Sequence, residues 1–280
     1  MGSLTARGAW RQIMLMKPLD FLCALAVVSS GALAQTTAVP DSWPDLKIQL
    51  FKQAPIVEDS TFASLDAPPR AEDAALVPVA LNLHPPAGDS RRVVRLSLVI
   101  DENPVPLAGE FTLGPKADVS RIATRVRVNA YSNMRLIAEL DDGSLHMTKT
   151  YVKAAGGCSA PAAKAQDEAN VDIGKMKLRT IDDAASGRAD LVVMLRHPNN
   201  SGLQMDQVTR IYTPARYVDH LAVYQGGDLI FSVGGGISIS EDPNFRFDFA
   251  LHGAKTLKVE ASDIDNVHFQ ANWTLEKSGS

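Results

Sequence analysis

The sequence predicts an all-β protein, two immunoglobulin-like β-sandwich domains joined by a flexible linker that carries a cysteine. Three observations lead to this fold class. Short apolar runs recur along the chain, several of them alternate with polar residues, and clusters of Pro, Gly, Asn and Asp separate them. No stretch keeps a helical periodicity for more than three turns, and short strands at this spacing are typical of β-sandwiches.

The first series of predicted strands lies in residues 76–158. Within it, Val126 and Val128 alternate with Arg125 and Arg127, the period-2 pattern of a half-buried strand. We therefore expect the valines to face a core and the arginines to face solvent. The predicted strands are residues 79–83, 93–100, 121–130, 134–140 and 145–152.

The second series lies in residues 174–276. Phe245, Phe247 and Phe249 alternate with polar residues, which predicts a strand with one aromatic core face. Residues 159–173, between the series, are rich in Ala, Lys, Gln, Asp and Glu without apolar periodicity, and predict a linker. The predicted strands are residues 176–179, 191–195, 218–224, 229–233, 237–239, 245–251, 256–259 and 267–273.

The N-terminal part has the features of an export signal. Basic residues precede an apolar run at 21–28, and Ala32 and Ala34 supply the small-x-small pattern that a signal peptidase accepts. Residues 1–34 are therefore interpreted as a signal peptide, with Met14 or Met16 as alternative starts, and the mature protein is expected to be periplasmic. Residues 35–75 predict short helical or extended pieces, of which Trp43–Phe51 is the most amphipathic.

Composition excludes some function classes. The chain has 280 residues, 45% hydrophobic and 21% charged, with a net charge of −4. These values are ordinary for a globular protein, and nothing in them points to nucleic acid or an anionic membrane as partner.

One cysteine remains after leader removal, because Cys23 lies inside the apolar run and only Cys158 follows it. A single cysteine cannot form a disulfide within the chain. It is a reactive thiol, an intermolecular partner or a buried bystander. Gly156, Gly157 and Pro161 are poor residues for a core strand, so the sequence favours an accessible thiol on a flexible glycine arm.

Catalytic and metal-binding alternatives have weaker support. A nucleophilic cysteine needs a histidine base, but none of the six histidines lies in a cysteine-protease signature. The chain offers no closely spaced metal-ligand set. His197-Pro198 is interpreted as a structural strand-end turn, and the three glycines at 234–236 as a turn or bulge. We expect no catalytic residue, metal site or cofactor.

Two groups of residues resemble a known carrier. The segment Tyr-Val-Lys-Ala-Ala-Gly-Gly-Cys that ends at Cys158 resembles the end of the SoxY subunit of sulfur oxidation. The second half is similar to its partner SoxZ in Arg196-His197-Pro198, in Tyr-Gln-Gly at 224–226, and in Gly-Ile-Ser-Ile-Ser-Glu-Asp-Pro at 236–243. Together the halves look like the fused SoxYZ-like carrier associated with quinoprotein dehydrogenases.

The resemblance implies a non-enzymatic periplasmic carrier. Cys158 would hold sulfur intermediates covalently, Gly156 and Gly157 would form the arm, and partner enzymes and cytochromes of sulfur oxidation or a quinoprotein dehydrogenase pathway would load and unload it. This chain departs from the family in that it continues beyond Cys158, so that the arm is internal. A disulfide dimer through Cys158 is a further possibility.

Two other functions stay open from the sequence. The chain is alternatively a non-catalytic immunoglobulin-like binding or adhesion module, in which Cys158 is incidental or forms an intermolecular disulfide. A protein that helps to present substrate to a quinoprotein dehydrogenase is compatible with the carrier role. Cys158→Ser separates a carrier, which it inactivates, from a binding module, which it leaves unaffected.

Overall fold

The structure, a computed structural model, describes residues 41–161, 171–183, 187–207 and 209–275. The predicted signal peptide at 1–34, its cleavage site, Cys23 and most of the predicted linker lie outside these ranges. Among the helices within them, none is long and apolar enough to cross a membrane.

The described residues form one helix and a succession of strands. The helix is α1 (Trp43–Phe51), the most amphipathic piece of residues 35–75, and it begins with a proline in its first turn. The strands are β1 (Ile56–Glu58), β2 (Ala63–Asp66), β3 (Val77–Leu83), β4 (Val93–Ile100), β5 (Leu107–Leu113), β6 (Val119–Val126), β7 (Ser132–Leu140), β8 (Leu145–Val152), β9 (Met176–Asp183), β10 (Arg188–Leu195), β11 (Val218–Gln225), β12 (Asp228–Gly234), β13 (Asn244–Ala250), β14 (Thr256–Asp263) and β15 (His268–Thr274).

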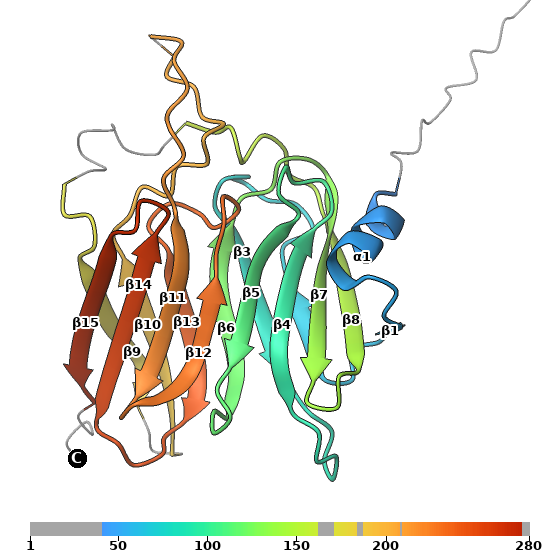
Figure 1. Cartoon of the computed structure of the whole chain (residues 1–280), viewed down its shortest axis with the longest axis vertical. Coiled ribbons are helices and arrows are strands. Elements are labelled where there is room, and N and C mark those ends of the chain that lie inside the picture. The colour runs from blue at the N-terminus through green and yellow to red at the C-terminus, as the bar shows by residue number, and fades with distance from the viewer. Residues whose placement is uncertain (1–40, 162–170, 184–186, 208, 276–280) are drawn as a thin grey trace, which may run out of the picture. The chain divides into compact units, whose positions relative to one another are not determined.

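The strands make two sheets that face each other (Figure 1). The larger sheet has nine strands in the order β1-β8-β7-β4-β5-β12-β11-β14-β15, and the smaller has six in the order β2-β3-β6-β13-β10-β9. Neighbouring strands are antiparallel except for β1, which pairs in parallel with β8. The all-β fold class predicted from the sequence is confirmed.

Both sheets continue from the first half of the chain (residues 41–158) into the second (residues 174–275). In the larger sheet β5 pairs with β12, Leu113 opposite Phe231. In the smaller sheet β6 pairs with β13, Ile122 opposite Phe247. The two halves are therefore joined by backbone hydrogen bonds in both layers, an arrangement that the sequence patterns did not indicate.

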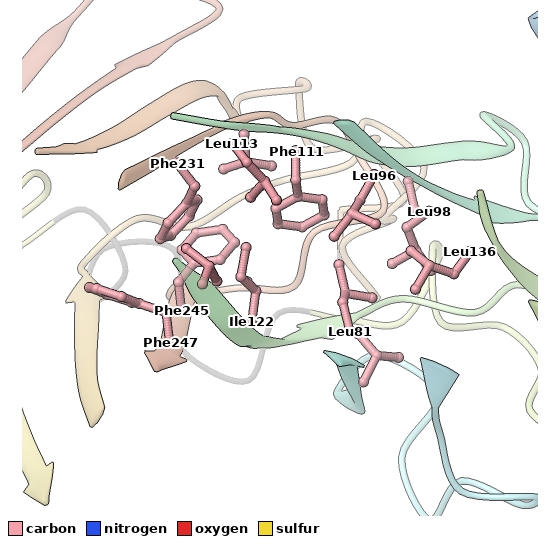
Figure 2. Packing of buried hydrophobic residues seen from close by; sticks show 14 of the residues in the cluster. Leu81, Leu96, Leu98, Phe111, Leu113, Ile122, Leu136, Phe231, Phe245 and Phe247 are labelled. Atoms are coloured by element: carbon pink, nitrogen blue, oxygen red, sulfur yellow. The ribbon is translucent and has the colours of Figure 1, made fainter. Parts of the chain in front are cut away.

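One hydrophobic core fills the space between the sheets and includes side chains of both halves. Figure 2 shows Phe111 and Phe231 of the larger sheet facing Phe245 and Phe247 of the smaller one. The ring centroids of Phe231 and Phe247 are 5.2 Å apart, a T-shaped contact. The aromatic face predicted for β13 is thus the core at the junction of the two halves.

A second, smaller cluster lies under α1, where Leu46 packs with Val99 and Ile137. Beside it, Arg135 forms a buried ion pair with Asp101 at 2.8 Å, and its guanidinium lies 4.2 Å from the ring centroid of Trp43. The helix therefore covers an outer face of the larger sheet that would otherwise expose apolar side chains and a charge pair.

Three details of the predicted strand series are wrong. The strand predicted at 121–130 ends at Val126. Strand β5 was not predicted, because Ala108, Gly109 and Glu110 interrupt its apolar pattern. The strand predicted at 237–239 is a turn with a single bridge from Ile239 to Val126, since the amide of Ile239 bonds the carbonyl of Gly236. Between β10 and β11 the chain makes a long excursion beyond the strand ends, drawn in orange in Figure 1.

Candidate functional site

The segment that carries Cys158 follows β8 and is attached to the first half by backbone hydrogen bonds. The amide of Gly156 donates to the carbonyl of Asn129 at 2.8 Å, and the amide of Gly157 donates to the carbonyl of Val128 at 2.9 Å. The amide of Ser159 closes a turn on the carbonyl of Gly156. Residues 156–159 are thus a folded turn in this structure.

The two glycines have different physical roles. Gly156 has φ of +80°, a conformation that glycine adopts without the steric cost of a side chain, and a Cβ there would meet nothing within 4 Å. At Gly157 a Cβ would lie 2.0 Å from the carbonyl oxygen of Ala74 and 2.7 Å from that of Val128. Gly157 therefore allows the segment to pack tightly against the first half.

The structure corrects the prediction of an accessible thiol, because Cys158 is 0% exposed. The flexibility of the arm at Gly156 and Gly157 stays a prediction. The sequence argument took the glycines as a sign of freedom, whereas Gly157 permits close backbone contact. The chain also continues past Cys158, and the segment is covered from the other side by the second half. The covalent attachment role of Cys158 stays a prediction.

Residues 199–204, in the excursion between β10 and β11, provide this cover. Ser201 Oγ donates to the carbonyl of Cys158 at 2.5 Å, and the amide of Ser201 donates to Gln204 Oε1 at 2.9 Å. Ser201 and Gln204 are themselves buried. Residues 156–159 therefore lie between the two halves and are hydrogen-bonded to both.

The structure also corrects the prediction for Arg127. The alternating pattern predicted that this side chain faces solvent, whereas it is 1% exposed. Strand β6 ends at Val126, and from there Arg127 reaches into the contact between the halves. Its Nη1 donates to the carbonyl of Gly157 and its Nη2 to that of Asn199, both at 3.3 Å. The alternation was misleading because it cannot show that a distant segment covers the polar face.

The electrostatics of the site follow from burial. Burial raises the pKa of the Cys158 thiol to about 11, and the positive charge of Arg127 opposes this shift only in part. Burial also lowers the pKa of Arg127, against the attraction of Cys158, Glu241 and Asp73. In this conformation the thiol is protonated at neutral pH and is a poor nucleophile.

A polar network supports the covering segment. His197, at the end of β10, is fully buried, with Nδ1 2.8 Å from Asn199 Oδ1 and Nε2 3.4 Å from Asp263 Oδ2. Burial lowers the pKa of His197, against its hydrogen bonds with Asp263 and Asn199. Arg216 also donates to Asp263, at 3.1 Å. This network holds Asn199, whose carbonyl accepts from Arg127.

The alternative chemistries find no support in the described part of the chain. There, no histidine hydrogen-bonds the Cys158 sulfur, and no group of three or more His, Cys, Asp or Glu side chains is placed to hold a metal ion. A hollow of about 550 Å³ lies across β3, β6, β10 and β13, with Arg121 and Arg246 in its lining, but Cys158 is not part of it.

Sequence reasoning missed Arg127, Ser201 and Gln204 as neighbours of Cys158. Ser201 and Gln204 lie more than 40 residues after it in a segment without regular pattern, so no local signal marks them. Arg127 lay inside the strand predicted at 121–130, whereas β6 ends at Val126, so no signal in the sequence marked it either. The site depends on contacts between distant segments.

Comparisons with known proteins assign both halves. Residues 47–158 match the family described as "Sulfur oxidation protein SoxY", and this match ends at Cys158 itself. Residues 178–274 match the family described as "Sulphur oxidation protein SoxZ". The comparison with curated protein sequences gives no significant match.

The comparison with solved structures gives matches with low TM-scores. The sulfur carrier protein SoxY from Chlorobium limicola f thiosulfatophilum is 23% identical, covers 40% of this chain and 91% of its own length, and has a TM-score of 0.34. Two forms of superoxide reductase (neelaredoxin) from Ignicoccus hospitalis are 12% identical. They cover 33% and 37% of this chain and 78% and 96% of their own, with TM-scores of 0.29 and 0.31. TM-scores below 0.5 are too low to inform on function.

The two family matches account for most of the chain and occur in the order expected of a fusion. They agree with two halves that share sheets and a core. The chain is therefore a fused SoxYZ-like protein, a SoxY domain followed by a SoxZ domain, of a sulfur-oxidation carrier family.

Proposed function

We propose that this protein is a periplasmic, non-enzymatic carrier that holds sulfur-containing intermediates covalently on Cys158. Partner enzymes of sulfur oxidation, or of a quinoprotein dehydrogenase pathway, load and unload the thiol. The observation that carries the proposal is the SoxY family match, which ends at Cys158 and is followed by a SoxZ match in the same chain. No catalytic residue or cofactor is required of the chain itself.

The burial of Cys158 adds a step to this function. A thiol that is 0% exposed, with a pKa raised to about 11, does not react with a donor in its present position. Residues 156–159 must leave their site for the thiol to be loaded and must leave again for the cargo to be passed on. Few backbone hydrogen bonds hold the segment, and local opening of such segments costs less than global unfolding.

The test is intact mass spectrometry on the protein isolated from its native periplasm, with and without reductant, beside Cys158→Ser. A carrier shows reductant-sensitive mass additions of sulfur or oxidised sulfur on Cys158 and none in the variant. Recovery from the periplasm also tests the location. A thiol that is unmodified, and that stays inert when sulfur donors and partner extract are added, contradicts the carrier function.

The burial itself favours a second candidate, a binding or adhesion module in which Cys158 is incidental. Free cysteines are commonly buried and unreactive, and Cys158 meets that description in this structure. For such a module, Cys158→Ser has no effect on function, and the mass spectrum shows no adduct. The same experiment therefore separates the two candidates.

A further inference from the structure

The contact between the halves contains buried N–H groups without acceptors. Among the described residues, two buried side-chain polar atoms lack a hydrogen-bond partner, Arg127 Nε and Gln204 Nε2. Both side chains belong to the hydrogen-bonded cluster that includes the cysteine segment. Arg127 donates to the carbonyl of Gly157, and Gln204 bonds Ser201, which donates to the carbonyl of Cys158. A buried donor without an acceptor is costly, so two in one hydrogen-bonded cluster are a marked feature.

The positive charge of Arg127 is also not neutralised by a neighbouring carboxylate among the described residues. Arg127 is 1% exposed and, within the described ranges, has no carboxylate within ion-pair distance; its bonded neighbours are the carbonyls of Gly157 and Asn199. The charges of Glu241 and Asp73 attract it and raise its pKa against the effect of burial. Buried cations are normally paired with an anion. The protonated thiol of Cys158 supplies none.

We propose that Arg127 and Gln204 form an anion-binding site that holds the negatively charged end group of an adduct on Cys158 when residues 156–159 are packed between the halves. The inference rests on the carrier function proposed above and assigns residues to its cargo. Arg127 supplies a charge-assisted donor and Gln204 a neutral one. The conformation with residues 156–159 packed between the halves is then more stable when Cys158 carries an anionic adduct than when it carries an uncharged adduct or is a free thiol.

The charges determine which adduct stabilises the packed conformation. An uncharged end group leaves Arg127 Nε and Gln204 Nε2 as they are, unpartnered. An oxoanion accepts from both and provides the missing negative charge. Because hydrogen bonds to charged groups stabilise by about 1.5–3 kcal/mol, the closed position should be favoured by roughly 10-fold or more for the anionic adduct.

Two adducts of matched shape test this. With the protein unfolded in urea, the Cys158 thiolate attacks an inner sulfur of tetrathionate; the central S–S bond breaks, thiosulfate leaves, and Cys–S–S–SO₃⁻ forms. Methyl methanethiosulfonate, attacked at its sulfenyl sulfur, releases methanesulfinate and leaves Cys–S–S–CH₃. In both cases the thiol proton passes to the buffer. The adducts differ in SO₃⁻ against CH₃, and each is confirmed by peptide mass mapping after refolding.

The readout is the rate at which dithiothreitol removes each adduct from the folded protein, divided by the rate in urea, which cancels the intrinsic chemistry of the two disulfides. We expect the folded protein to slow removal of the anionic adduct about 10-fold or more beyond its effect on the methyl adduct. Equal slowing, or failure of the anionic adduct protein to refold, overturns the proposal.

Three variants locate the effect. Arg127→Gln should abolish the difference between the adducts. Gln204→Glu keeps the acceptor for the Ser201 amide but replaces the unpartnered amide with a negative oxygen, so it should reduce or reverse the difference even if Arg127→Gln does not fold. Arg125→Gln is the matched control, because Arg125 also donates to backbone carbonyls of the second half, at Glu241 and Asp242, and has no bond to the cysteine segment. It should keep the wild-type difference.

This measurement does not depend on the physiological role of the protein. If the periplasmic protein carries no adduct but the anionic adduct is held selectively in vitro, the carrier function fails and the binding site stands. If native adducts are found and the selectivity is absent, the carrier function stands and the site is refuted.

Discussion

The packing of Gly157 makes the Gly157→Ala variant a direct test of how Cys158 is hidden. A Cβ at this position would lie 2.0 Å from the carbonyl oxygen of Ala74 and 2.6 Å from its carbon, distances that real Cβ atoms do not show. Both neighbouring atoms are backbone, so neither moves as freely as a side-chain end. We expect the variant to fold, because the core between the sheets is untouched, but with residues 156–159 displaced.

The size of the effect follows from the thiol pKa. Burial raises the pKa of the Cys158 thiol to about 11 in the packed position, against 9.0 without burial. At pH 8 the thiolate fraction is then about 1 in 1,000 when packed and about 1 in 10 when released, because each pH unit changes it about 10-fold. Gly157→Ala should therefore raise the rate of alkylation of Cys158 about 100-fold, before any gain from steric access.

The assay is the reaction of folded protein with iodoacetamide at pH 8, followed by peptide mass mapping of Cys158, with circular dichroism to show that the variant is folded. Gly156→Ala is the matched control. Its Cβ meets nothing within 4 Å, so it costs only about 1–2 kcal/mol for the left-handed φ and should leave the thiol largely protected. A folded Gly157→Ala protein that reacts as slowly as wild type would refute the packing argument.

Two further predictions concern stability. Since burial raises the pKa of Cys158 from 9.0 to about 11, the folded state binds a proton that the unfolded state has lost between these values. This contribution is complete below pH 9 and is lost as the pH rises through 11. Because half of the folded thiol is still protonated at pH 11, about 2 kcal/mol of it is lost by that pH. Urea unfolding at pH 8 and pH 11 should show wild type losing that much more than Cys158→Ser, and parallel losses would contradict it. Arg135→Met leaves Asp101 buried without its cation and should cost about 3–5 kcal/mol by urea unfolding, whereas Arg95→Met, an exposed pair, should cost about 0–1 kcal/mol. Equal costs for the two arginines would show that Asp101 is not left unpaired by the change.

Local pattern was sufficient for most of the strands. Alternation reveals β13, because side chains of a strand point to opposite faces and only one face of β13 meets the core. Nearly continuous apolar runs reveal β4 and β7, which are buried on both faces. Strand β5 was not predicted, because the sequence around Gly109 carries small and polar residues. The resemblance to SoxY and SoxZ also followed from the sequence, and the family matches confirm it.

The candidate site was only partly predictable. The sequence by itself determined that one cysteine follows the apolar run at 21–28, that two glycines precede it, and that it stands between two β-rich halves. It could not determine whether those glycines loosen the segment or let it pack. Gly156 and Gly157 look alike in sequence, and their difference lies in the carbonyls of Ala74 and Val128 that approach Gly157.

Tertiary structure alone decided what surrounds the thiol. Strand pairing of β5 with β12 and of β6 with β13 joins the halves, and the excursion after β10 then covers Cys158 with Ser201. That cover turns Arg127 from an expected surface residue into a buried cation. Hydrophobic period reports which face of a strand is apolar, but the burial of a polar face depends on distant segments that meet only in the folded chain.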